Sequence, residues 1–130
     1  VASSKSSVEV FVANALEPSE LEQFDVVYCT LFVHHLDPPD VVRLLKAMSS
    51  KARHLVIVDD LIRSRLGYLL AWIGTRLLSG SWVVHHDGPL SVKAAFTPAE
   101  ILDLASQAGL KNCVMERTWP ERYRLSWRPH

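Results

Sequence analysis

The chain has 130 residues, of which 48% are hydrophobic and 22% are charged. This length and composition are ordinary for one globular domain with a single core, and they argue against a disordered chain. The 14 basic and 14 acidic residues leave a formal net charge of zero. Nothing global therefore suggests a binder of nucleic acid or a polybasic binder of membranes.

The cysteines and the apolar segments give predictions about the cellular compartment of the protein. Cys29 and Cys113 lie far apart in apolar runs, which predicts reduced core residues in a cytoplasmic protein, with a disulfide as the alternative. Residues 1–7 are polar, which predicts an irregular lead-in without a signal peptide. The longest apolar stretch, from Leu66 to Leu78, is too short for a membrane span.

The first half of the chain predicts three elements. Residues 8–16 alternate with the period of a strand. The run from Phe24 to Val33 is continuously apolar, as in a strand that is covered on both sides, and would continue toward His34 and His35. Asp37 followed by two prolines predicts the start of a helix. The buried stripe of that helix would comprise Val41, Leu44, Leu45 and Met48.

The second half continues the alternation of strands and helices. Residues 54–60 predict a buried strand that ends on two acidic residues, and residues 62–78 predict a helix. Residues 80–90 read as a loop with a turn at residues 87–89. Thr97, Pro98 and Glu100 predict a capped helix that ends at Gly109.

Two further strands, over residues 111–119 and 122–127, would close the chain as a hairpin. The order of elements predicts an α/β fold with a mainly parallel sheet and a C-terminal antiparallel hairpin.

Five of these features together resemble a known family. They are Asn14-Ala15 after the first strand, FDVVYCTLFVHHL, LVIVDDL, the helix that starts at TPAE, and the closing hairpin. From Val8 to Trp127 the chain resembles the C-terminal two-thirds of a class I S-adenosylmethionine-dependent methyltransferase of the small-molecule type. The resemblance implies one partial Rossmann-like domain over residues 1–130, with a substrate-region insert at residues 62–96. It also implies S-adenosylmethionine as cofactor and O- or C-methylation of a small, hydrophobic acceptor.

The chain departs from that family in one respect. The family's glycine-rich turn of the G-x-G-x-G type, which lets the backbone approach the cofactor, has no counterpart in this sequence. We therefore expect a fragment that does not hold the cofactor tightly by itself. The alternative is a non-catalytic remnant or a dimerising interaction module.

The same departure leaves the strand from Phe24 to Val33 as an exposed apolar edge. We expect two chains to pair through this edge, or residues 8–16 to move over and cover it. The helix from Leu66 to Leu78, which is apolar around most of its circumference, is the second candidate surface for a homodimer.

The resemblance also implies the residues that meet the cofactor. Asn14 would accept a hydrogen bond from the adenine amine, and the backbone of Ala15 would contact a ring nitrogen. Thr30, Leu31 and Phe32 would border the methionine part. The alternatives are a turn cap at Asn14 and plain core packing at Leu31.

The candidate catalytic residues are two histidines, because a neutral imidazole can act as a general base near pH 7. His35 stands at the end of the apolar strand, with a structural or pocket-lining role as the alternative. His86 stands in the insert beside His85, where a polar loop is the alternative.

The remaining candidate site residues concern the acceptor. Trp82 and His85 in the insert would contact it. Asp60 with Arg63 would form a surface ion pair or line the entrance. We expect no metal site, because these residues lack the spaced ligands of a closed site.

Overall fold

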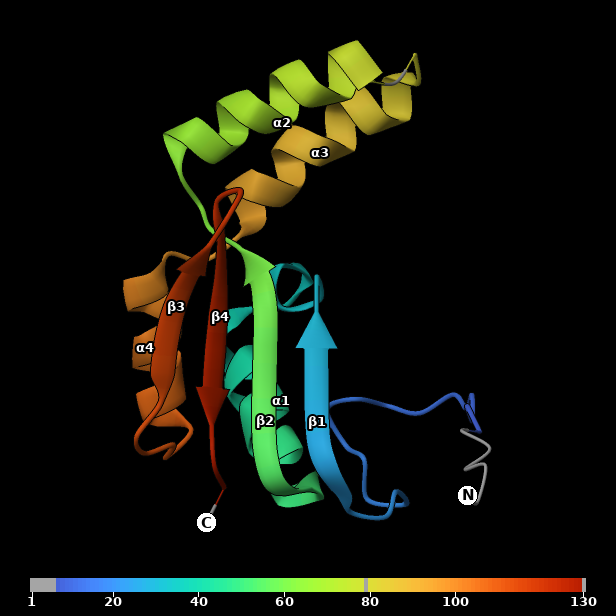
Figure 1. Ribbon diagram of the computed structural model, residues 1–130, viewed down its shortest axis with the longest axis vertical. Helices are drawn as coiled ribbons and strands as arrows, with labels where there is room; N and C mark the ends of the chain where they lie inside the picture. The colour runs from blue at the N-terminus through green and yellow to red at the C-terminus, as the bar shows by residue number, and fades with distance from the viewer. Residues whose placement is uncertain (1–6, 79, 130) are drawn as a thin grey trace, which may run out of the picture.

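The computed structural model describes residues 7–78 and 80–129 (Figure 1). The predicted lead-in at residues 1–7 lies outside the described residues except for Ser7. The strands are β1 (Phe24–Thr30), β2 (Ala52–Leu61), β3 (Val114–Thr118) and β4 (Arg122–Trp127). The helices are α1 (Pro38–Lys51), α2 (Arg65–Leu78), α3 (Trp82–Ala94) and α4 (Pro98–Gln107), with a 3-10 turn, η1 (Val33–His35).

The four strands form one sheet in the order β1-β2-β4-β3. The β1–β2 pair is parallel, with Thr30 opposite Asp59, whereas β2–β4 and β3–β4 are antiparallel. The α/β class, the partial Rossmann-like sheet and the C-terminal hairpin are confirmed. The sheet is mixed rather than mainly parallel, because the described residues before β1 contribute no strand to it.

The prediction of a strand at residues 8–16 is wrong. The described backbone there is irregular, and Val8, Val10 and Val12 are all exposed. Alternation supplies the side-chain period of a strand, but a strand also needs a neighbour for its backbone hydrogen bonds. Residues 8–16 make no such pairing, so they do not cover β1, which is an edge strand.

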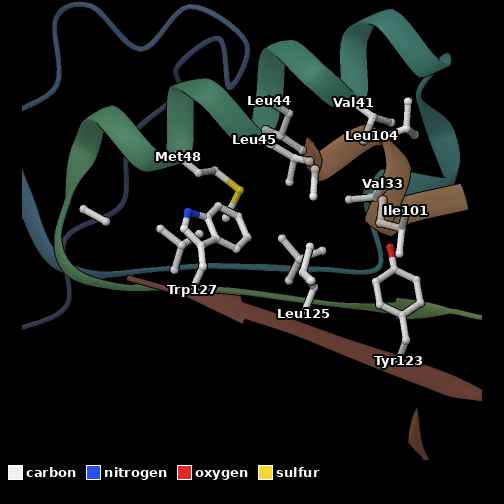
Figure 2. Close-up of a cluster of buried hydrophobic side chains, with 14 of the residues drawn as sticks. Val33, Val41, Leu44, Leu45, Met48, Ile101, Leu104, Tyr123, Leu125 and Trp127 are labelled. Carbon is white, nitrogen blue, oxygen red and sulfur yellow. The ribbon is translucent and has the colours of Figure 1, made fainter. Parts of the chain in front are cut away.

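The hydrophobic core lies on one face of the sheet, between β4 and the helices α1 and α4 (Figure 2). The predicted stripe of α1 is confirmed. The labelled core side chains are Val33, Val41, Leu44, Leu45, Met48, Ile101, Leu104, Tyr123, Leu125 and Trp127. Trp127 Nε1 donates to Ser49 Oγ at 2.7 Å, which satisfies the indole at the rim of this core.

The opposite face of the sheet carries no helix, since α1 and α4 both lie behind it in Figure 1. Alternate residues of β1 reach solvent there, and Phe24, Val26 and Tyr28 are all exposed. A strand of a parallel pair is ordinarily buried on both faces. The sheet therefore presents both an open edge and an open face at β1.

The start of α4 agrees with its sequence. Thr97 Oγ1 accepts from the backbone N–H of Glu100 at 3.3 Å, and the Glu100 carboxylate accepts from the Thr97 N–H at 3.2 Å. This reciprocal capping box satisfies two amide groups that the helix itself cannot pair. Past the end of the helix, Gly109 has a φ of 78°, the left-handed conformation that glycine adopts at little cost.

The loop predicted at residues 80–90 is wrong, because these residues belong mainly to α3. Pro89 lies inside that helix, where it is buried. The reason is tertiary: α3 packs against α2 at Gly88, where a Cβ would stand only 2.7 Å from Thr75 Cγ2. Close packing against a second helix thus outweighs the helix-breaking tendency of Gly-Pro.

Two glycine substitutions test this contact. Gly74→Ala, in the interior of α2 with nothing near its Cβ position, should stabilise the protein by about 0.5–1 kcal/mol because alanine favours a helix. Gly88→Ala should destabilise it by about 1–3 kcal/mol. Thr75 cannot rotate away freely, since its Oγ1 donates to Ala71 O at 2.7 Å. Thermal unfolding of the two variants measures both effects, and a stabilising Gly88→Ala would contradict the packing.

Candidate functional site

The carboxyl end of β1 turns sharply instead of continuing to the histidines. The strand ends at Thr30, and Leu31 has a φ of 51°, in the left-handed region that a leucine rarely occupies. The Leu31 N–H still donates to Asp59 O of β2 at 3.1 Å. The η1 turn follows, so strand alternation does not set the directions of His34 and His35. Their ring centroids lie 4.0 Å apart.

A buried pair joins η1 to β2. His34 Nδ1 lies 2.7 Å from Asp60 Oδ1, and the His34 backbone N–H donates to Asp60 Oδ2 at 3.3 Å. The two side chains are 6% and 1% exposed. A carboxylate acceptor holds the imidazole proton on Nδ1, which leaves Nε2 as the acceptor of the neutral ring. Sequence reasoning chose His35 and missed this pair.

The adjacent Asp59 points to the other face of β2 and is also buried. Its Oδ1 accepts from Arg122 Nε at 2.9 Å and from Arg122 Nη2 at 2.5 Å. Arg122 Nη2 also lies 3.3 Å from Thr30 Oγ1, which accepts from it. Thr30, Asp59 and Arg122 therefore link three neighbouring strands at the same end of the sheet.

The predicted pairing of Asp60 with Arg63 is wrong. Asp60 is buried and committed to His34, whereas Arg63 is exposed and pairs with Glu100 of α4. The Arg63 backbone N–H donates to Phe96 O at 3.1 Å. A carboxylate at the end of a central strand is buried on the core face by alternation, so it needs a partner from that face.

Asn14 and Ala15 lie in a turn before β1. Asn14 Oδ1 accepts from the Leu16 N–H at 3.1 Å, and Asn14 O accepts from the Glu17 N–H at 3.2 Å. The side chain thus closes its own turn, which is a common use of asparagine. A ligand amine would share that oxygen, which has two lone pairs.

Ala15 and Phe32 come together at one cavity. Its volume is about 220 Å³, and it lies between β1, α1 and the turn that precedes β1. Its lining is almost wholly apolar and includes Val27, Cys29 and Met48. Burial raises the pKa of the Cys29 thiol to about 11, and the charge of Asp60 acts in the same direction. The thiol is therefore neutral at pH 7 and lines the cavity as an apolar group.

The candidates of the insert lie elsewhere. Trp82, His85 and His86 belong to the first turns of α3, at the end of the α2–α3 hairpin that is remote from the sheet (Figure 1). The Trp82 and His86 rings stack, with centroids 5.3 Å apart and planes at 5°. The predicted site residues thus divide into a group at the ends of β1 and β2 and a group at the hairpin tip. Among the described residues, no three His, Cys, Asp or Glu gather as a metal site would require.

Comparison of the sequence with protein-family models and with curated proteins returned no match. Solved structures do match. A candidate O-methyltransferase from Nostoc punctiforme aligns over 91% of this chain with a TM-score of 0.59 at 18% identity. PigF, solved with S-adenosylhomocysteine, aligns over 88% with a TM-score of 0.59 at 11% identity. An O-methyltransferase family 2 protein from Planctomyces limnophilus, in complex with apigenin, aligns over 88% with a TM-score of 0.57 at 12% identity.

The chain has the class I S-adenosylmethionine-dependent methyltransferase fold. It matches 35%, 37% and 33% of the length of these three proteins, in the portion that the sequence resemblance assigns to the C-terminal part of the fold. The methyltransferase fold places its cofactor at the carboxyl ends of the parallel strands, as open α/β sheets generally do. In this chain the carboxyl end of β1 leads into a corner formed by Thr30, Leu31 and Phe32.

The residues at the corner fit part of such a cofactor. Leu31 and Phe32 are exposed there, and Phe32 and Ala15 share the apolar cavity. Burial also keeps the neighbouring thiol of Cys29 neutral, which suits an uncharged ring. These groups can cover the planar and aliphatic parts of the cofactor. The described residues contain no glycine-rich turn that would cradle its remaining polar parts.

The buried pair gives a stability prediction. Asp60→Ala should cost about 3–5 kcal/mol, because it leaves His34 buried without its acceptor. Asp40→Ala is the matched control, since Asp40 forms an exposed ion pair with Arg43 at 3.0 Å and should cost less than about 1 kcal/mol. Urea unfolding measures both. Equal losses would contradict a structural role for the buried pair.

The backbone of Leu31 gives a second prediction. The left-handed region costs an L-residue about 1–2 kcal/mol, and a β-branched side chain suffers most there. Leu31 is 45% exposed, so glycine loses little burial. We expect Leu31→Gly to be more stable than Leu31→Val by about 1–2 kcal/mol, as measured by chemical denaturation. A more stable valine variant would show that the corner relaxes to an extended conformation.

Proposed function

We propose that this chain serves S-adenosylmethionine-dependent methyl transfer to a small, hydrophobic acceptor, by O- or C-methylation, as the C-terminal portion of a cytoplasmic methyltransferase. The observation that carries the proposal is the corner at Thr30, Leu31 and Phe32, which stands exposed at the carboxyl end of the parallel pair. Two buried acidic residues of β2 hold this corner. On the core face Asp60 contacts His34, and on the other face Asp59 accepts from Arg122, which also donates to Thr30. PigF is solved with S-adenosylhomocysteine, and the Planctomyces protein with the phenolic ligand apigenin.

The cofactor-facing roles follow from this placement. The backbone of Ala15 and the side chain of Phe32 would flank the adenine, and Asn14 Oδ1 would accept from its amine. Thr30 and Leu31 would border the methionine part. When bound, the cofactor supplies a methyl group that its sulfonium already activates. The protein's main task is then to align the acceptor and exclude water.

The candidate base closest to this corner is His35. Its ring centroid lies 4.0 Å from that of His34, with the two planes tilted by 40°, and Asp60 fixes His34 in place, so His35 has a rigid neighbour on one side. An exposed imidazole that is neutral near pH 7 can take the proton of an acceptor hydroxyl. His86, with Trp82 and His85, stands at the hairpin tip and would serve only if the acceptor extends along α3. His35 is therefore the stronger candidate.

Asp60 and Arg63 take different roles from those that the sequence suggests. Asp60 would position η1 through His34 rather than contact the acceptor. Arg63 is exposed at the base of the hairpin, where the acceptor could enter.

The second candidate function is a non-catalytic interaction module. The observation that favours it is the open edge of β1, whose unpaired backbone groups and exposed Val26 and Tyr28 suit pairing with a second copy of the chain. In that case the apolar cavity beside β1 would be covered by the partner copy rather than by a cofactor.

Calorimetric titration with S-adenosylmethionine tests the two functions. The methyltransferase reading predicts weak but saturable binding, on the order of 1 mM or tighter, that Phe32→Asp weakens at least about tenfold. Val114→Asp is the matched control, because Val114 is also an exposed apolar residue, on β3 at the other edge of the sheet. Its binding should equal that of the unmodified chain.

The absence of binding at several times that concentration, together with a dimeric mass by light scattering, would contradict the proposal and favour the interaction module. Binding that Phe32→Asp leaves unchanged would place the cofactor away from the corner.

A further inference from the structure

The α2–α3 hairpin buries few of its apolar side chains, whereas a helix of a globular protein usually buries an apolar face. Among its described residues, α2 buries only Gly67, and α3 buries only Pro89 and Val92. The two helices meet through small groups at Gly88 and Thr75. Most of the large apolar side chains face outward; Val92 is an exception that packs against Gly67. Small residues between helices with apolar residues outside is the arrangement of helices that pack in lipid.

The outward apolar residues of α2 form a regular stripe. They recur at the spacing of one helix face and comprise Leu66, Leu69, Leu70, Ile73 and Leu77, all exposed. The stripe continues to the hairpin tip, where Leu78 is 89% exposed and Trp82 is 74% exposed. In Figure 1 this tip is the part of the hairpin farthest from the sheet. The side chains of the sheet and of α1 and α4 therefore leave it uncovered.

The charges of the hairpin complement an anionic surface. Residues 65–94 contain three basic residues, Arg65, Arg76 and Lys93, against the single acidic Asp87. The segment therefore carries a formal charge of +2 with neutral histidines, although the whole chain carries zero. α2 itself has no acidic residue.

Two of the cations also lie over aromatic rings. The Arg76 guanidinium lies 4.2 Å from the centroid of Trp72, and Lys93 Nζ lies 5.0 Å from that of Tyr68. Side chains in this arrangement keep the charged group near water while the apolar part of the pair is buried. Tryptophan beside arginine is characteristic of segments at the boundary between lipid headgroups and acyl chains.

We propose that the α2–α3 hairpin is a membrane-surface anchor that inserts its tip and the outward face of α2 into the headgroup region of an anionic lipid leaflet. No described helix is long and apolar enough to cross a membrane. The hairpin therefore lies in the interface, with Trp72 and Trp82 at the boundary and Arg65 and Arg76 toward the lipid phosphates.

The competing occupant is the same face of a second copy. That arrangement brings two segments of charge +2 together, which opposes association, whereas an anionic leaflet attracts the same charge. The charge thus favours lipid over self-association. Both occupants are distinguished by the experiment below.

Binding of the full 130-residue chain to phosphatidylcholine vesicles, with and without phosphatidylglycerol, tests the anchor. We expect cosedimentation that increases with the anionic lipid and decreases with added salt. Leu77→Glu at the tip and Leu70→Glu on the stripe should each weaken binding about tenfold or more. Val114→Glu is the control, since Val114 is 53% exposed on β3, and it should bind like the unmodified chain.

A fluorescence measurement on the folded chain supports the same test without a destabilising change. Brominated lipids should quench the tryptophan emission of the chain, and Trp82→Phe should reduce the quenched fraction. Trp119→Phe removes an exposed tryptophan at the β3–β4 turn that stays away from the lipid, so it should not reduce that fraction and should raise it, because only unquenched emission is lost. Circular dichroism confirms that each variant keeps its helices.

Failure to cosediment with anionic vesicles would overturn the proposal. So would a dimer in solution that Leu70→Glu dissociates while vesicle binding is absent, because the second copy would then be the occupant. Neither result depends on cofactor binding, so the outcome is independent of the proposed methyl transfer.

Discussion

The candidate site depends on one buried contact, between His34 of η1 and Asp60 of β2. β1 leaves the sheet at Leu31 in a conformation that costs a leucine free energy, so some contact must hold the chain in that turn. Asp60 does so twice, by accepting from both the backbone and the ring of His34. Because the contact is buried, it stabilises the turn only while both partners are present. Removal of either one leaves a buried polar group without a partner. The exposed corner and the neighbouring ring of His35 take their positions from this pair.

The sequence predicted those parts of the fold whose stability is local or periodic. The stripe of α1 and the capping box at Thr97 each depend on residues within a few positions of one another, and each is confirmed. The failures involve partners that are distant in the chain. Residues 8–16 have strand alternation but no neighbouring strand, and α3 forms through Gly88 against α2 although its sequence reads as a turn. Such partners have no signature in a short window.

The same contrast applies to the candidate site, where strand order predicted positions but did not predict the partner of a buried side chain. Resemblance and strand order located Thr30, Leu31 and Phe32 at a carboxyl end, because parallel strands end at the same edge of a sheet. Pattern alone assigned Asp60 to Arg63, three residues away in sequence. The structure pairs Asp60 with a histidine 26 residues away, since both side chains face the core. Two adjacent acidic residues on a strand always face opposite sides, so Asp59 and Asp60 required one partner from each face.

The hairpin and the corner are connected through the fold, since α3 contacts η1 as well as α2. A lipid surface that orients the hairpin would therefore also orient the turn that carries His34 and His35. A hydrophobic acceptor partitions into the same leaflet because its apolar area leaves water there. An enzyme that held its site beside that leaflet would meet such an acceptor at a higher local concentration than in solution. The net charge of zero does not show that the charge is distributed unevenly. Residues 65–94 carry an excess of positive charge, and many of their apolar side chains face outward.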